Sequence, residues 1–198
     1  MIFRRQTVPV LVLPQFYIVL AVSLLVIPLK WLLGWFFAAA FHELGHYLAL
    51  RICRCPIYSI QIGLTGAAMV TAPMSSATEL ICSISGPLFG ACLLLLSKQF
   101  PVLAVCAFTQ TAYNLFPVYP MDGGRVLRCV LKYLLPERTA IRISNVISFA
   151  LYGAGAVLLM VVCIRLSAPA LLLLIGIVFA FKYYRGKSSC NGRHYAVQ

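Results

Sequence analysis

The chain has 198 residues, of which 62% are hydrophobic and 10% charged, and its mean hydropathy is +0.96. Soluble domains carry about 25% charged residues, so this composition excludes an ordinary soluble protein and indicates an integral membrane protein. The net charge is +12, and because the basic residues fall between apolar segments, it favours contact with anionic lipid over binding of nucleic acid.

Six apolar segments are long enough to cross a bilayer, since a spanning helix needs roughly 20 apolar residues. The predicted fold class is therefore an all-α polytopic membrane protein with about six transmembrane helices. One domain would cover residues 1–184 and a polar cytoplasmic tail residues 185–198. The first segment lacks a small-residue cleavage site, so it is interpreted as a retained span and not a signal peptide. The expected spans are about 9–29, 31–50, 79–97, 101–121, 144–164 and 167–183.

The basic residues predict the orientation of these spans. With the N-terminus in the cytosol, 13 of the 16 Lys and Arg residues fall on the cytoplasmic side. The other three, Lys30, Lys98 and Arg165, fall in the outer turns. Cytoplasmic loops carry an excess of Lys and Arg, so both termini are expected in the cytosol.

Residues 56–73 do not fit a helix. Apolar residues alternate with polar or small ones from Ile60 to Thr65, which is the periodicity of a strand. Thr65 and Gly66 supply a turn, so we expect a small membrane-associated β-hairpin at about 57–71. An ordinary cytoplasmic loop is the alternative. Next along the chain, Ser76 and Glu79 have the spacing of a capping box, which gives Glu79 a structural role.

The second predicted span contains HELGH at residues 42–46. Histidines four residues apart share one helix face, so His42 and His46 can both bind one zinc ion. Glu43 is rotated by about 100° around the axis, where its carboxylate can accept a proton from a water molecule. The alternative is a histidine pair that packs against helix neighbours or binds something other than zinc.

A catalytic zinc ion has three protein ligands, which leaves a third ligand to find. The remaining candidates are Glu79, Glu137, His194 and Asp122, the only aspartate of the chain. Glu79 is assigned to a cap, Glu137 lies in a basic loop and His194 lies in the tail. Elimination therefore favours Asp122.

The setting of Asp122 agrees with this choice. It closes YNLFPVYPMD at the cytoplasmic end of the fourth predicted span, and HELGH lies near the same end of the second. Pro117 and Pro120 break the helix and Gly123 frees the backbone, so Asp122 can turn inward. The alternative is that Asp122 only caps the following helix.

HELGH together with NLFPVYPMDGG resembles the motifs of the site-2 protease family of intramembrane zinc metalloproteases. The matching positions of the second motif are Asn114, Pro117, Pro120, Asp122 and Gly123. Met121 stands where the family often has leucine. The resemblance is greatest to the bacterial branch that processes sporulation sigma-factor precursors, and the CBS domain often found in that branch is expected to be missing here.

The resemblance implies a role for each site residue. His42, His46 and Asp122 would bind one Zn²⁺ ion per chain, and Glu43 would act as general base and then as proton donor. Asn114 would hold the substrate or the oxyanion, although an interhelical hydrogen bond is the alternative. Gly86 and Pro87 would shape the site, and Pro120 and Gly123 would be further structural residues near it. The GxxxG spacing of Gly86 and Gly90 alone favours close helix packing.

The implied reaction is cleavage of a transmembrane or membrane-associated protein near the cytoplasmic face. An extended substrate segment would add to the hairpin edge, near Gln61, Gly63, Thr65 and Pro117. The bilayer is an expected partner and nucleic acid is not, while a membrane regulator and a homo-oligomer stay open. The expected location is a bacterial cell membrane or an internal sporulation membrane. The alternatives are a non-proteolytic metal-binding transporter and an inactive scaffold homologue.

Overall fold

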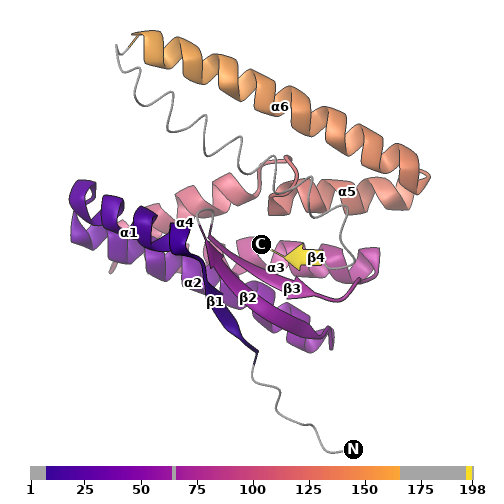
Figure 1. The fold of residues 1–198 in the computed structure, drawn as a ribbon, viewed down its shortest axis with the longest axis horizontal. Coiled ribbons are helices and arrows are strands. Elements are labelled where there is room, and N and C mark those ends of the chain that lie inside the picture. The colour runs from indigo at the N-terminus through magenta and orange to yellow at the C-terminus, as the bar shows by residue number, and fades with distance from the viewer. Residues whose placement is uncertain (1–7, 64–65, 166–194, 198) are drawn as a thin grey trace, which may run out of the picture.

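The structure is a computed structural model that describes residues 8–63, 66–165 and 195–197. This part of the chain is mostly helical with one small sheet, as expected from the sequence, and it has six α-helices, of which α5 was not predicted (Figure 1). In chain order the elements are β1 (Val10–Val12), α1 (Pro14–Val26), α2 (Leu29–Ile52), β2 (Ile57–Gly63), β3 (Gly66–Thr71), α3 (Ser76–Cys92), the 3-10 turn η1 (Leu93–Leu96), α4 (Pro101–Asn114), α5 (Asp122–Leu134), α6 (Glu137–Arg165) and β4 (Tyr195–Val197).

The sheet has the strand order β1-β2-β3-β4, with β1 parallel to β2 and the other pairs antiparallel. The hairpin of β2 and β3 lies where the alternating pattern predicts it, with Ile60 opposite Met69. Thr65, which the sequence predicts in the turn of the hairpin, lies outside the described residues. The hairpin rests on α2 and α3, because Met69 packs with Leu50 and Cys82 in one buried cluster.

Two strands of this sheet were not predicted. The expected span at 9–29 is wrong in its first part, because Val10–Val12 pair with β2 and the helix begins only at Pro14. Proline suits the first turn of a helix, where its missing N–H costs no hydrogen bond. At the other end of the chain, Tyr195–Val197 of the predicted polar tail pair with β3.

The helices that carry the HELGH and YPMDGG segments are joined through α3. α2 packs against α3 and α4, α3 packs against α5, and α5 packs against α6. The approach of α2 to α3 requires a glycine, since a Cβ at Gly45 would lie 2.6 Å from the Ser85 carbonyl oxygen. α3 therefore holds both segments in a fixed relation.

The start of α3 differs from the predicted capping box. The N-cap is Ser75 and not Ser76, and its side chain accepts a hydrogen bond of 3.2 Å from the Thr78 amide. The Glu79 carboxylate does not close a capping box, because it faces Arg125 of α5 at 3.5 Å. A buried guanidinium needs a negative partner, and that requirement determines the role of Glu79.

The fourth predicted span, 101–121, is also wrong in its last third. α4 ends at Asn114, after 14 residues, and an irregular loop follows to Met121. Pro117 and Pro120 lie in this loop, and the Tyr119–Pro120 peptide is cis. At 1.5 Å per residue α4 is about 21 Å long, which is shorter than the hydrocarbon core of roughly 30 Å.

Two helical segments among the described residues are long and apolar enough to cross a membrane, Ser76–Leu96 and Glu137–Leu158. α2 has 24 residues, but the polar HELGH side chains lower its hydropathy. α6 begins at Glu137, seven residues before the expected span 144–164, and the expected span 167–183 lies outside the described residues. The full set of six spans therefore stays a prediction.

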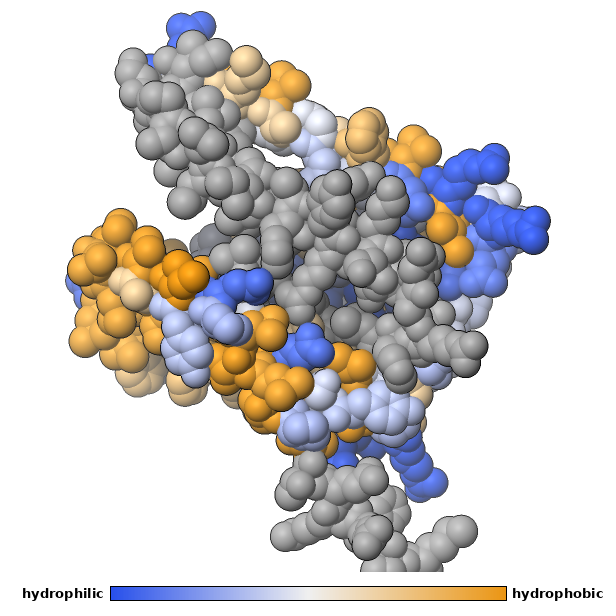
Figure 2. Space-filling model, viewed as in Figure 1, coloured by the Kyte–Doolittle hydropathy of each residue, from blue (hydrophilic) through white to orange (hydrophobic). Residues whose placement is uncertain are grey.

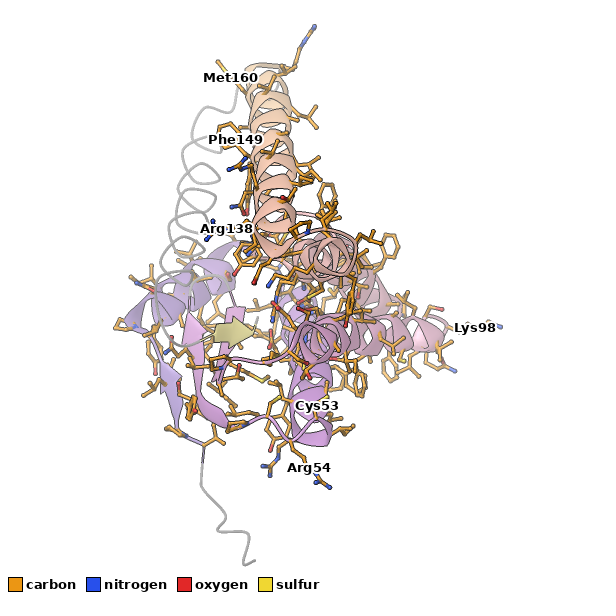
Figure 3. All side chains as sticks on the ribbon, turned by 90° about the vertical axis from the view of Figure 1, so that its right-hand side faces the viewer. Cys53, Arg54, Lys98, Arg138, Phe149 and Met160 are labelled. Atoms are coloured by element: carbon orange, nitrogen blue, oxygen red, sulfur yellow. The ribbon has the colours of Figure 1, made fainter. Side chains whose placement is uncertain are left out.

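The distribution of side chains is that of a membrane protein. Large apolar side chains are exposed along α1, the first half of α2, α3, α4 and α6. Figure 2 shows this apolar surface over α1 and α2, and Figure 3 shows α6 projecting from Arg138 past Phe149 to Met160. Phe149 is 71% exposed, whereas His42, Asp122 and Arg125 are buried. Polar groups inside and apolar groups outside suit a chain surrounded by lipid.

Candidate metal centre

Two helices bring three potential ligands to one buried point. His42 and His46 lie one turn apart on α2, and Asp122 is the first residue of α5. Their side chains are 2%, 0% and 2% exposed. These are the residues that the sequence predicts as ligands, and their ligand atoms lie within 4.8 Å of one another.

The distances between the ligand atoms fit a tetrahedral metal ion. Asp122 Oδ2 lies 3.1 Å from His42 Nε2 and 3.3 Å from His46 Nε2, and the two Nε2 atoms are 3.2 Å apart. Ligands at 2.0–2.1 Å from a tetrahedral zinc ion are separated from each other by about 3.3 Å. The three atoms thus form one face of a tetrahedron with the correct edge length.

The ring of His46 is fixed for metal binding by its second nitrogen. Nδ1 of His46 lies 2.7 Å from the Cys82 carbonyl oxygen of α3, which can accept its proton. Nε2 is then the nitrogen with a free lone pair, as in most protein metal sites. Gly86 of α3 lies against the same ring, because a Cβ there would overlap His46 Nε2 and lie 2.9 Å from His42 Nε2.

Two carboxylate oxygens near the ligands have no hydrogen-bond partner among the described residues. They are Oε2 of Glu43 and Oδ1 of Asp122, and both atoms are buried. Burying such acceptors without partners costs free energy, so they are suited to a metal ion, a water molecule or a substrate group. Glu43 is thus free to receive a proton.

Asn114, the last residue of α4, also reaches this point. Its Nδ2 lies 3.3 Å from His42 Nε2. The amide can therefore donate a hydrogen bond to a group at the ligands. The same contact joins α4 to α2, so a structural role as an interhelical hydrogen bond is also consistent with it.

Two glycines of α5 and one arginine contact the loop before Asp122 and hold it in place. Cβ atoms at Gly123 and Gly124 would overlap the backbone of residues 115–119, so only glycines let α5 begin there. The Arg128 guanidinium lies 3.6 Å from the centre of the Tyr119 ring, and its Nη2 donates to Asn145 Oδ1 of α6 at 2.7 Å. These contacts keep Asp122 directed at the histidines.

The residues predicted to bind substrate do not converge on one point as the ligands do. Gln61 is paired on both sides, with Leu11 of β1 and Ala68 of β3, so its backbone does not lie at an edge of the sheet. Gly63 is buried at the end of β2, and Pro117 is exposed in the loop after α4. Pro87 is buried beside Gly86 in α3, and Pro120 is half-buried in the loop. Met69–Thr71 of β3 pair with β2 on one side and with Tyr195–Val197 of β4 on the other.

Several residues of the site were missed from the sequence. The Cys82 carbonyl carries no sequence signal, since any residue type offers it. Arg125 could have been found, because it follows Asp122 by three residues and so lies on the same helix face. Its Nε–Glu79 pair ties α5 to α3.

Comparisons with known proteins agree with this geometry. No protein-family model matches the chain. The zinc metalloprotease MJ0392 of Methanocaldococcus jannaschii is 27% identical over 150 residues, which cover 67% of this chain and 44% of the relative. The solved site-2 protease from Methanocaldococcus jannaschii superimposes with a TM-score of 0.65 at 23% identity, over 93% of each chain. The chain has a site-2 protease fold. It spans less than half the length of the curated relative.

Proposed function

We propose that the chain is a zinc-dependent intramembrane endopeptidase that cleaves a membrane-associated protein near the cytoplasmic face. The observation that carries this proposal is the triangle of His42, His46 and Asp122 atoms, with edges of 3.1 to 3.3 Å. The site-2 protease fold and the likeness to a zinc metalloprotease support it.

The roles of the surrounding residues follow from their chemistry. A bound zinc ion would supply Lewis acidity toward water and a carbonyl group. The Glu43 carboxylate takes a proton from the attacking water and delivers it to the nitrogen of the leaving amine. Asn114 donates from Nδ2 to the substrate carbonyl oxygen, which gains negative charge as the water oxygen bonds to the carbon. His42, His46 and Asp122 hold the metal.

The substrate would be bound as an extended segment, because a peptide bond within an intact helix is shielded by its own turn. It would add antiparallel to Met69–Thr71 of β3, in the place that Tyr195–Val197 hold in this structure. Gly63, Thr65, Pro117 and the side chain of Gln61 stay candidates for contacts outside the strand pairing.

The test is cleavage of a membrane-anchored test protein by the purified chain in lipid vesicles. We expect Glu43→Gln to keep one zinc ion and to lose cleavage by roughly 100-fold or more. Glu137→Gln is the matched control. Because Glu137 is 71% exposed, this variant should cleave the test protein as the wild type does. If Glu43→Gln cleaves like wild type, the protease proposal is wrong. Zinc transport without cleavage would instead support a metal carrier. The absence of both cleavage and zinc transport would support an inactive scaffold.

The substrate class is proposed on the resemblance alone. Candidates are a sigma-factor precursor, as in the sporulation branch, and an anti-sigma factor, in the cell membrane or an internal sporulation membrane. Proteins that accumulate uncut in cells with Glu43→Gln, and not in cells with wild type, would identify it. Cysteine labelling from either side of the membrane tests whether both termini are cytoplasmic.

A further inference from the structure

The two histidines of the centre differ in what holds their second nitrogen. His46 Nδ1 lies 2.7 Å from the Cys82 carbonyl oxygen. His42 Nδ1 is buried and has no hydrogen-bond partner among the described residues. If His42 binds a metal through Nε2, its neutral ring carries the proton on Nδ1, so this nitrogen is a donor that needs an acceptor.

The hydroxyl of Thr111 on α4 is a candidate acceptor for the His42 Nδ1 proton. Its Oγ1 is buried and also has no partner within the described part of the chain. Both atoms border the space left by the missing side chain of Gly90. A Cβ at Gly90 would overlap Thr111 Oγ1 and would lie 3.7 Å from His42 Nδ1.

A second threonine on the same helix shows that this orientation is not a general property of α4. The hydroxyl of Thr109 is exposed and donates to the Val105 carbonyl oxygen one turn earlier, at 2.9 Å. The Thr111 hydroxyl, in contrast, is buried without a partner among the described residues and borders the Cβ position of Gly90 in α3. It also precedes Asn114 by three residues, so both lie on the helix face that meets His42.

We propose that Thr111 is a positioning residue of the metal centre. Its hydroxyl accepts the Nδ1 proton of His42, directly after a small rotation of the side chain or through one bridging water molecule. This fixes the tautomer and the ring orientation of His42, as the Cys82 carbonyl does for His46. Gly90 is the residue that leaves room for the contact. The inference rests on the proposed function, because it assumes a metal at His42 Nε2.

The test is the zinc dissociation constant of the full chain in detergent, measured by competition with a chelator. Thr111→Val keeps the shape and removes the hydroxyl, and we expect zinc binding to weaken by roughly 10- to 100-fold. Thr111→Ser should restore most of the affinity. Thr109→Val, on the same helix, should leave it unchanged. Gly90→Ala, which displaces the Thr111 hydroxyl, should weaken binding as Thr111→Val does.

Cobalt substituted for zinc gives a readout that general loosening of the fold would not mimic. We expect the ligand-field spectrum to change in Thr111→Val and to return in Thr111→Ser, with unchanged helix content by circular dichroism. Equal zinc affinity and equal cobalt spectra in wild type and Thr111→Val would overturn the proposal for Thr111 and leave the proposed function intact. A wild-type chain that binds no zinc would overturn both.

Discussion

Arg125 Nε lies 3.5 Å from Glu79 Oε1, and this pair joins α5 to α3. Arg125 is 4% exposed and Glu79 is 15% exposed, so little solvent screens the two charges. Arg125 follows Asp122 by one helix turn. The pair therefore fixes the start of α5, and with it the position of the third ligand.

Removing one charge of this pair should destabilise the protein. In Glu79→Gln the Arg125 guanidinium stays buried without a counterion, which costs roughly 3–5 kcal/mol for a well-buried pair. We expect a lower midpoint of thermal unfolding and weaker zinc binding, because α5 loses its attachment to α3. The measurement is unfolding in detergent followed by circular dichroism.

The chain offers a matched surface pair as control. Lys132 and Glu137 are 3.1 Å apart but Glu137 is 71% exposed. Exposed ion pairs contribute roughly 0–1 kcal/mol, so Glu137→Gln should change the midpoint little. The double variant Glu79→Leu with Arg125→Met should recover part of the loss. Equal midpoints for Glu79→Gln and Glu137→Gln would contradict a structural role of the buried pair.

The thiol of Cys129 reports on the same region. Burial, and then the nearby Glu79 carboxylate, raise the pKa of Cys129 to about 11. The thiol is therefore protonated at pH 8, and only the thiolate reacts with maleimides. We expect Cys129 to stay unlabelled at pH 8 in the wild-type chain and to be labelled in Glu79→Gln, as read by mass spectrometry. Rapid labelling of wild type would contradict tight packing of α5 on α3.

The ligands of the centre could be predicted because their chemistry is rare in this sequence. A chain with three histidines and a single aspartate leaves few combinations for a three-ligand metal site. The spacing of His42 and His46 sets their common face. The contacts that orient these ligands could not be predicted, since the Cys82 carbonyl and the Glu79–Arg125 pair depend on how α3 packs between α2 and α5.

The errors in the predicted fold also have physical reasons. Val10–Val12 are apolar in either a strand or a helix, so periodicity cannot separate the two in so short a run. α4 was predicted too long because Leu115 and Phe116 continue its hydropathy, although Pro117 already indicated an end. Tyr195–Val197 form a strand only because the β3 edge is available to pair with them.

Gly86 should tolerate no side chain. A Cβ at this position would overlap His46 Nε2 and lie 2.9 Å from His42 Nε2, in the space where a metal would bind. We expect Gly86→Ala to reduce the zinc content of the purified chain from one per chain toward zero, with its helix content unchanged. Gly153→Ala in α6 is the control, because among the described residues no atom beyond its own helix turn lies within 4 Å of its Cβ position. One zinc per chain in Gly86→Ala would place the metal elsewhere.

Zinc should stabilise the folded chain through Asp122. A ligand at 100 times its dissociation constant adds about 2.7 kcal/mol to the free energy of unfolding. We expect the unfolding midpoint of wild type to fall on treatment with a chelator and to return with zinc. Asp122→Ala removes one of the three ligands, so its midpoint should respond little to either. A zinc response in Asp122→Ala equal to that of wild type would exclude Asp122 as a ligand.

The strand β4 should compete with a substrate for β3. Tyr195–Val197 pair with Thr71, Val70 and Met69, which are the backbone groups that an added strand would use. A chain ended at His194 lacks this competitor, so we expect a lower KM for the membrane-anchored test protein and an unchanged kcat. A full-length chain with Ala196→Pro is the second variant, because proline cannot donate to the ladder and should weaken β4 without shortening the chain. An unchanged KM in both variants would show that substrate does not add at the β3 edge.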